Sequence, residues 1–136
     1  MPDLQIIKFI NLTLAILWIY QGLVPKVLFI NTIEIQIWEK LGLTVEHAIT
    51  AGRLSGVVEI LFGISLIFIS RYCMHILNIL ALLGLLLLII ILMPTQLIQG
   101  FNPVVMNIAM ISLSVIYFML INPKNLTFKS IFQSNH

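Results

Sequence analysis

The sequence predicts an all-α polytopic membrane protein, a four-transmembrane-helix bundle with a short interfacial helix between spans 1 and 2. Of its 136 residues 60% are hydrophobic and only 9% are charged, with a mean hydropathy of +1.12, whereas a soluble domain has about 25% charged residues. The apolar residues fall into four stretches near the ~20 residues that a helix needs to cross a bilayer. The length allows one such bundle, so residues 1–136 are expected to form a single domain.

The first span is expected at about residues 6–24. The start of the chain superficially resembles a signal peptide, but it lacks a small-x-small cleavage site and its apolar stretch is long enough to span. We therefore keep it as a membrane helix. Pro25 follows directly, and it should stop or kink the helix because proline lacks a backbone N–H.

The connection at residues 27–43 is the longest and allows two interpretations. Asn31 or Thr32 is a suitable cap for a short helix that ends at Gly42. The alternating isoleucines of IEIQI also fit a strand, but an isolated strand leaves backbone groups unpaired, which lipid does not tolerate. We favour a helix lying at the membrane interface, with Trp38 at headgroup level.

Three further spans follow, each with its own boundary signals. An Asn-Pro pair starts a helix well, because Asn caps it and Pro fits its first position. The third span has no charge within its interior and should face lipid more than the others do. We expect span 2 at residues 49–69 after Thr44, span 3 at residues 74–93 before Pro94, and span 4 at residues 104–121 between Asn102-Pro103 and Asn122-Pro123.

Four spans place both chain ends on one side of the membrane. Basic residues favour the cytoplasmic side, and this side has four of them against two or three on the other. Both termini are therefore predicted to be cytoplasmic. The basic residues on the side of the termini are Lys8, Arg71, Lys124 and Lys129, and those on the other side are Lys26 and Lys40, with Arg53 at its membrane edge.

Glu59 is the residue around which the other helices should be arranged. It lies in the apolar stretch from Ala48 to Ile69, about 15 Å into span 2 at about 1.5 Å per residue, where a charge is costly to bury. Gly52, Gly56 and Gly63 share its helical face, and their spacing lets another helix approach closely. Glu59 must therefore be protonated, hydrogen-bonded or paired. Two roles remain open for it. Glu59 is either a functional carboxylate that handles protons or binds a ligand, or a structural residue whose hydrogen bonds across helices fix their register.

Further polar residues are expected in the outer half of the bundle with Glu59. Lys26 lies at the outer end of span 1, on the same side as the N-terminus of span 4, and a helix N-terminus favours anions. Arg53 either joins this anion or headgroup site or extends to the lipid headgroups. Each residue by itself could equally serve only to hold neighbouring helices together. Together, however, they outline a polar pocket: Tyr20, Gln21, Lys26, Arg53, Glu59, Asn102 and Asn107.

Several function classes are excluded. No basic run is interleaved with aromatic residues, so nucleic acid is not an expected partner. Cys73 is the single cysteine, which excludes a C-x-x-C pair and an all-cysteine metal site. His47 and His75 begin spans on opposite sides, about 30 Å apart, and cannot share one metal. We predict no metal and no cofactor, and leave open a membrane quinone or a haem held by one histidine.

Three short segments carry a resemblance to a known family. WIYQGLVPK, GVVEILFG and FNPVVMNIAM, in this order and spacing, resemble the DoxX-like family of bacterial four-helix membrane proteins. The resemblance covers nearly the whole chain and implies a bundle in the bacterial cytoplasmic (inner) membrane. The family takes its name from a subunit of an archaeal thiosulfate:quinone oxidoreductase, and most members have no assigned activity. Its motif positions fall on Gln21, Pro25, Lys26, Glu59, Asn102, Pro103 and Asn107.

The first functional hypothesis is a non-enzymatic or accessory integral membrane protein. It would bind a lipidic or small anionic ligand in the polar pocket, with Glu59 taking or releasing a proton, and could act as a homo-oligomer or within a larger membrane complex. The alternative is a membrane subunit of a quinone-linked oxidoreductase, in which Glu59 or Lys26 handles the protons of the quinone. A proton-coupled transporter is the third hypothesis, and no repeat between the halves supports it. All three share the lipid bilayer as a partner.

Overall fold

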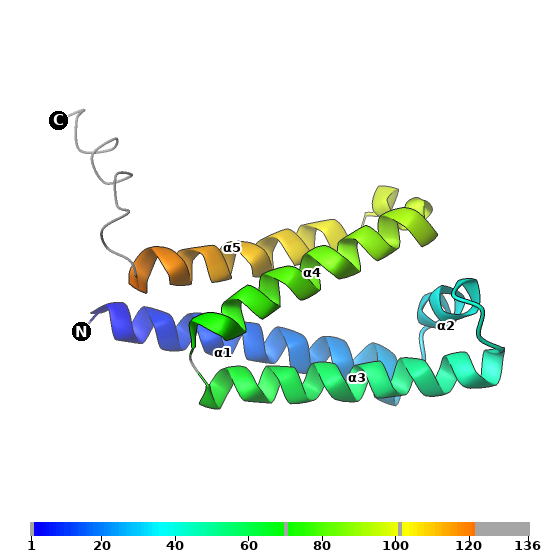
Figure 1. The fold of residues 1–136 in the computed structure, drawn as a ribbon, viewed down its shortest axis with the longest axis horizontal. Helices are drawn as coiled ribbons and strands as arrows, with labels where there is room; N and C mark the ends of the chain where they lie inside the picture. The colour runs from blue at the N-terminus through cyan, green and yellow to red at the C-terminus, as the bar shows by residue number, and fades with distance from the viewer. Residues whose placement is uncertain (1, 70, 101, 122–136) are drawn as a thin grey trace.

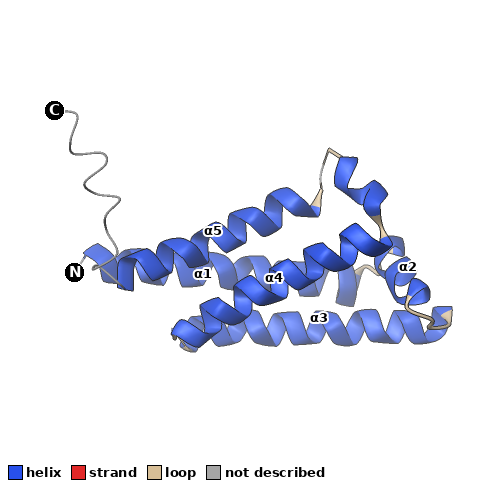
Figure 2. Ribbon diagram, turned by 45° about the horizontal axis from the view of Figure 1, so that its top comes forward, coloured by secondary structure: helices blue, strands red, loops and turns tan. Residues whose placement is uncertain are grey.

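The computed structural model describes residues 2–69, 71–100 and 102–121, and this part of the chain is all-α (Figures 1 and 2). Within it, four helices are long and apolar enough to cross a membrane. They are α1 (Pro2–Gly22) continued by the π-helical turn η1 (Leu23–Leu28), α3 (Val45–Phe68), α4 (Tyr72–Leu92) and α5 (Pro103–Ile121). The short helix α2 (Thr32–Lys40) connects the first two spans, and the 3₁₀ turn η2 (Pro94–Ile98) follows α4. The chain is thus a multi-pass membrane protein in contact with lipid, as predicted.

The four long helices are arranged as two pairs. α1 packs along α3 and α4 packs along α5, and α1 also contacts α5 between the pairs (Figure 1). The start of α1 and the end of α5 lie at the same end of the bundle, whereas α2 lies at the opposite end, which we call the α2 end. The predicted closing pair Asn122-Pro123 and the basic residues Lys124 and Lys129 lie outside the described residues.

The predicted caps explain where two of the helices begin. Asn31 caps α2, and its side-chain oxygen accepts a hydrogen bond from the Ile33 N–H at 3.0 Å. The segment is therefore a helix and not a strand. Asn102 caps α5 in the same way through the Val105 N–H at 3.2 Å, and Pro103 is the first helical residue. Both caps satisfy backbone donors that a helix N-terminus leaves unpaired.

The first span does not stop at Pro25, contrary to one of the two predicted outcomes. Pro25 has no N–H to donate to the carbonyl four residues earlier, and the chain continues as the wider turn η1. The Phe29 N–H donates to the Val24 carbonyl, five residues earlier, at 2.9 Å, which is the π-helical pattern. Lys26, within this turn, is buried.

The glycine face of α3 allows close approach, as its spacing predicted: Gly56 and Gly63 pack against α1 and η1, whereas Gly52 packs against α2. A Cβ atom added to Gly56 would lie 2.6 Å from the Gly22 carbonyl oxygen and 2.8 Å from the Lys26 Cβ. One added to Gly63 would lie 2.8 Å from the Ala15 carbonyl oxygen. The two helices are thus in backbone contact, which only small residues permit. This contact brings the end of α1 and the turn η1 against the middle of α3.

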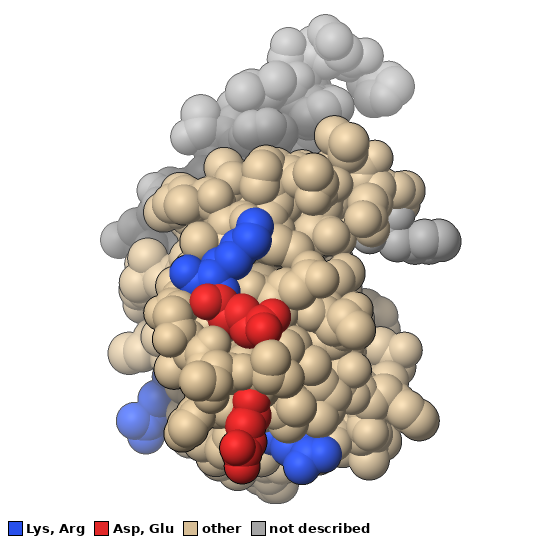
Figure 3. Space-filling model, turned by 90° about the vertical axis from the view of Figure 1, so that its right-hand side faces the viewer, with Lys and Arg blue, Asp and Glu red and all other residues tan. Residues whose placement is uncertain are grey.

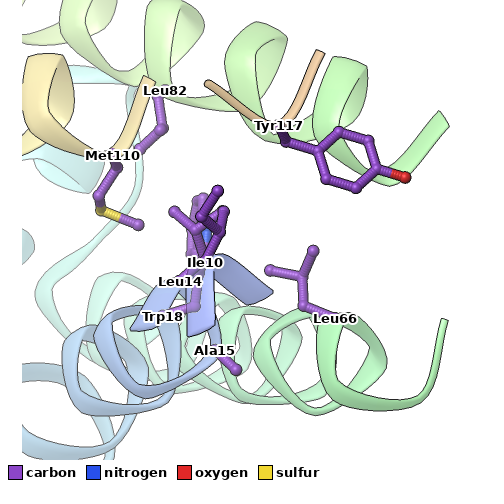
Figure 4. Packing of buried hydrophobic residues seen from close by; sticks show 8 residues of the cluster. All are labelled: Ile10, Leu14, Ala15, Trp18, Leu66, Leu82, Met110 and Tyr117. Atoms are coloured by element: carbon purple, nitrogen blue, oxygen red, sulfur yellow. The ribbon is translucent and has the colours of Figure 1, made fainter. Parts of the chain in front are cut away.

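An apolar core fills the space between the two helix pairs (Figure 4). In the figure, the α4 and α5 residues of the core face the residues of α1 and α3. The core therefore joins the two pairs into one bundle. Its buried members are Ile10, Leu14, Ala15 and Trp18 of α1, Leu66 of α3, Leu82 of α4, and Met110 and Tyr117 of α5.

A buried polar network, not predicted from the sequence, lies beside this core. The Trp18 indole N–H donates to Asn78 Oδ1 at 2.7 Å, and Asn78 Nδ2 donates to Ser114 Oγ at 2.8 Å. The His75 ring lies between Ser114 Oγ and Asn11 Oδ1, 3.1 Å from each. A neutral imidazole fits both contacts, because one ring nitrogen donates to Asn11 and the other accepts from the Ser114 hydroxyl. The network ties α1, α4 and α5 together.

The glycine contact leads to a stability prediction. Gly56→Ala should lower the free energy of unfolding by about 1–3 kcal/mol, because the added methyl group overpacks the contact between α1 and α3. Unfolding in detergent by titration with sodium dodecyl sulfate would measure this. Gly84→Ala is the matched control, since nothing lies within 4 Å of a Cβ at Gly84. Equal losses in the two variants would contradict the prediction.

Candidate functional site

Lys26 is the centre of a buried charged cluster near the α2 end. Its ammonium group lies 2.7 Å from Glu59 Oε1 of α3 and 3.2 Å from Glu34 Oε1 of α2. It also donates to Ser55 Oγ at 3.4 Å. Lys26 and Glu59 are only 8% and 7% exposed. Of the three states expected for Glu59, the structure shows the paired one.

Three local features bring these side chains together. The turn η1 places Lys26 on the side of α1 that faces α3, and the contact between Gly22 and Gly56 lets the two helices approach. The cap at Asn31 starts α2 beside this contact. At the other end of α2, Lys40 donates to the Leu92 carbonyl at the end of α4. The helix α2 therefore extends across the cluster from α3 towards α4.

The cluster lines a cavity of about 400 Å³ at the α2 end. Seen from this end, basic and acidic side chains lie next to each other on the surface (Figure 3). Leu85, Leu88 and Ile89 of α4 form an apolar side of the cavity. Its polar lining consists of Gln21, Lys26, Asn31, Glu34, Trp38, Ser55, Glu59 and Asn107.

Three buried polar atoms have no hydrogen-bond partner among the described residues, and all three belong to residues that line this cavity. They are Gln21 Oε1, Trp38 Nε1 and Glu59 Oε2. Buried polar groups are almost always paired, because an unpaired one costs free energy. Two of these atoms accept hydrogen bonds and one donates, so a molecule with a hydroxyl group matches both kinds.

The structure brings together four of the seven residues that the sequence placed in a polar pocket. Gln21, Lys26, Glu59 and Asn107 all line the cavity. Asn107 makes no hydrogen bond with Glu59. Its amide instead donates to the Leu82 carbonyl at 3.4 Å.

The other three residues lie outside the cavity lining. Tyr20 is 60% exposed on α1, and Arg53 is exposed on α3 without an ion pair to any described residue. The Asn102 side chain is occupied with capping α5 and with a hydrogen bond to the Gln99 carbonyl at 3.1 Å. The cavity therefore holds one basic residue instead of the two expected.

Four polar residues of the cavity lining were not predicted from the sequence: Asn31, Glu34, Trp38 and Ser55. Trp38 was expected at headgroup level instead, and Asn31 only as a helix cap. Residues four apart share a helical face, and this spacing relates Glu34 to Trp38 and Ser55 to Glu59. This spacing was a signal for Glu34, Trp38 and Ser55.

A model of the DoxX-like family matches residues 15–115. The chain belongs to the DoxX-like family. The match extends over every residue that lines the DoxX-like pocket. Comparisons with curated proteins and with solved structures gave no match.

The DoxX-like pocket is built on an ion pair and not on grouped metal ligands. Among the described residues, no three His, Cys, Asp or Glu side chains lie close enough together to hold a metal ion. The two pocket carboxylates, from Glu34 and Glu59, share the ammonium group of Lys26 instead. The chemistry that these groups can perform is hydrogen bonding and proton exchange.

The buried pair leads to a second prediction. Lys26→Met should lower the free energy of unfolding by about 3–5 kcal/mol, because it leaves the Glu59 carboxylate buried without its partner. Adding Glu59→Met should restore most of the loss, since both charges are then gone. Titration with sodium dodecyl sulfate in detergent would measure both variants. If the double variant is no more stable than Lys26→Met, the unpaired Glu59 carboxylate is not the cause of the lost stability, which contradicts the prediction.

Proposed function

We propose that this DoxX-like protein binds the polar head of a lipidic ligand in the cavity at its α2 end, as a ligand-binding or accessory membrane protein. The observation that carries the proposal is the set of three unpartnered polar atoms on one cavity, from Gln21, Trp38 and Glu59. A polar head with both donor and acceptor groups would complete their hydrogen bonds. The bilayer around the helices is the source of such a ligand.

The charges of the cavity favour an uncharged head over a small anion. One ammonium group, from Lys26, faces two carboxylates, from Glu34 and Glu59, so an excess negative charge remains when all three are ionised. Arg53, which would have attracted an anion, lies outside the lining. An anionic ligand would be repelled by the second carboxylate, whereas a hydroxyl group would not.

The two oxygens of Glu59 support different roles for the same carboxylate. Oε1 accepts from Lys26 at 2.7 Å, and Oε2 has no partner among the described residues. A proton on Oε2 would change that atom from acceptor to donor while the bond to Lys26 remains. Glu59 can thus adjust its hydrogen bonding to a bound head group through one proton.

A membrane quinone is the alternative ligand, and with it a quinone-linked oxidoreductase subunit is the alternative function. The Trp38 indole N–H is a free donor that suits a quinone carbonyl oxygen, and Glu59 Oε2 is an acceptor that suits a hydroquinone hydroxyl. Both groups lie on the same cavity. The experiment on co-purified ligand separates this alternative by the absorbance of the bound molecule.

The test is mass spectrometry and an absorbance spectrum of gently purified protein. A lipidic molecule should co-purify with the wild type and fall at least tenfold in Glu59→Gln. The matched control is Glu46→Gln, an exposed acid in the first turn of the same helix, which should retain the ligand. A quinone spectrum lost in Glu59→Gln would favour the redox role, and equal ligand in all three proteins would contradict the binding role of Glu59.

We also propose that both termini are cytoplasmic in a bacterial inner membrane, so that the pocket lies in the outer half of the bundle. In a Cys73→Ser background, Leu43→Cys should react with a membrane-impermeant maleimide on intact cells. Gln5→Cys should react only after the cells are opened. Leu43 lies between α2 and α3 and Gln5 in the first turn of α1, at opposite ends of the bundle, and both are exposed. The reverse labelling pattern would place the pocket on the cytoplasmic side.

A further inference from the structure

We propose that the hydrocarbon chain of the ligand lies in an apolar groove between α3 and α4, and that the ligand enters the pocket sideways from the bilayer. This inference rests on the proposed function and names the class of ligand: a long-chain amphiphile with an uncharged, hydrogen-bonding head. The groove has a volume of about 610 Å³. Its sides include Val58 and Phe62 of α3 and Leu77, Ala81 and Gly84 of α4.

The groove and the polar cavity lie next to each other. They share four lining residues: Ser55, Glu59, Leu85 and Leu88. Glu59 therefore lies at the junction of the two, and its Oε2 is buried without a partner among the described residues. A polar head at this junction and an apolar chain along the groove would match the two linings, and a molecule with only one of these parts would match half of the space.

The groove is open to the surroundings of the bundle. Val58 on one side of it is 64% exposed and Leu77 on the other is 50% exposed. α3 and α4 diverge from the connection that joins them and are not among the closely packed helix pairs (Figures 1 and 2). Since both helices are membrane spans, the surroundings here are lipid chains. A ligand dissolved in the bilayer reaches Glu59 through this opening without crossing water.

Gly84 supplies an independent observation. It interrupts a run of leucine and isoleucine in α4, where glycine costs about 1 kcal/mol relative to alanine. At Gly56 and Gly63 the space of the missing side chain is taken by α1, but nothing lies within 4 Å of a Cβ at Gly84. The missing side chain is therefore not needed for packing of the described helices. Its effect is to widen the groove.

The test uses a sixteen-carbon alcohol with a photoactivatable diazirine on its chain, in phosphatidylcholine vesicles that contain the full chain. Labelling of the wild type should concentrate on the groove residues of α3 and α4. Gly84→Phe should fill the groove and lower labelling at least tenfold, and Gly84→Leu should act in the same direction. Leu87→Phe is the matched control, because Leu87 is 58% exposed on the same helix and lies outside the groove; it should change labelling less than twofold.

In the same assay, Glu59→Gln tests whether the head group binds in the pocket, whereas Gly84→Phe tests whether the chain lies in the groove. A loss of labelling in both Glu59→Gln and Gly84→Phe supports the inference. If labelling falls in Glu59→Gln but not in Gly84→Phe, the hydrocarbon chain does not lie in the groove. That result overturns this inference and leaves the proposed pocket intact. If labelling falls in Gly84→Phe but not in Glu59→Gln, the head group does not bind at Glu59. That result contradicts both this inference and the proposed function. Labelling spread evenly over all exposed helix faces would show ordinary lipid contact and would overturn the inference.

Discussion

The ion pair between Lys26 and Glu59 is the constraint on which the rest of the bundle depends. Neither charge can lie alone among lipid chains, so each fixes where the other must be. The pair forms only because Gly22 and Gly56 let α1 and α3 touch along their backbones. Since desolvation offsets much of the attraction in a buried pair, its main effect is on register. It holds η1 and α3 at one rotation and one height, and α2 closes over them through Glu34.

The bundle contains two buried polar systems of opposite character. The network around His75 is made of uncharged groups, and Asn11, Asn78, Ser114 and Trp18 are hydrogen-bonded in it to the His75 ring or to one another. The cluster around Lys26 is charged and leaves three lining atoms without partners. The first system joins α1, α4 and α5, and none of its atoms is among the buried polar atoms that lack a partner in the described part of the chain. All three of those atoms belong to residues that line the cavity of the second system, at the α2 end, which is why we propose the ligand site there.

Local patterns in the sequence were enough for the fold and for part of the site. The four spans, the helix α2, the caps at Asn31 and Asn102, and the glycine face of α3 all follow from neighbouring residues, and the structure confirms them. The partner of Glu59 did not follow, because pairing depends on how two helices are rotated against each other. A span that is apolar on every side gives no sign of which side is buried. His75 was interpreted as a boundary residue for the same reason, although its spacing to Asn78 marked a polar face.

Because Lys26 lies in the π-helical turn η1, the site depends on how many residues this turn contains as well as on their types. A helix turns by roughly 100° per residue, so losing one residue between α1 and Lys26, such as Leu23 or Val24, would rotate Lys26 by roughly that angle relative to α1 if the winding of the turn stayed the same. The ammonium group would then face lipid or another helix, and Glu59 would be left alone. Composition and hydropathy would barely change. Two chains of this kind with nearly identical hydropathy profiles can therefore differ completely in whether they possess a charged pocket, and the length of one turn decides between them.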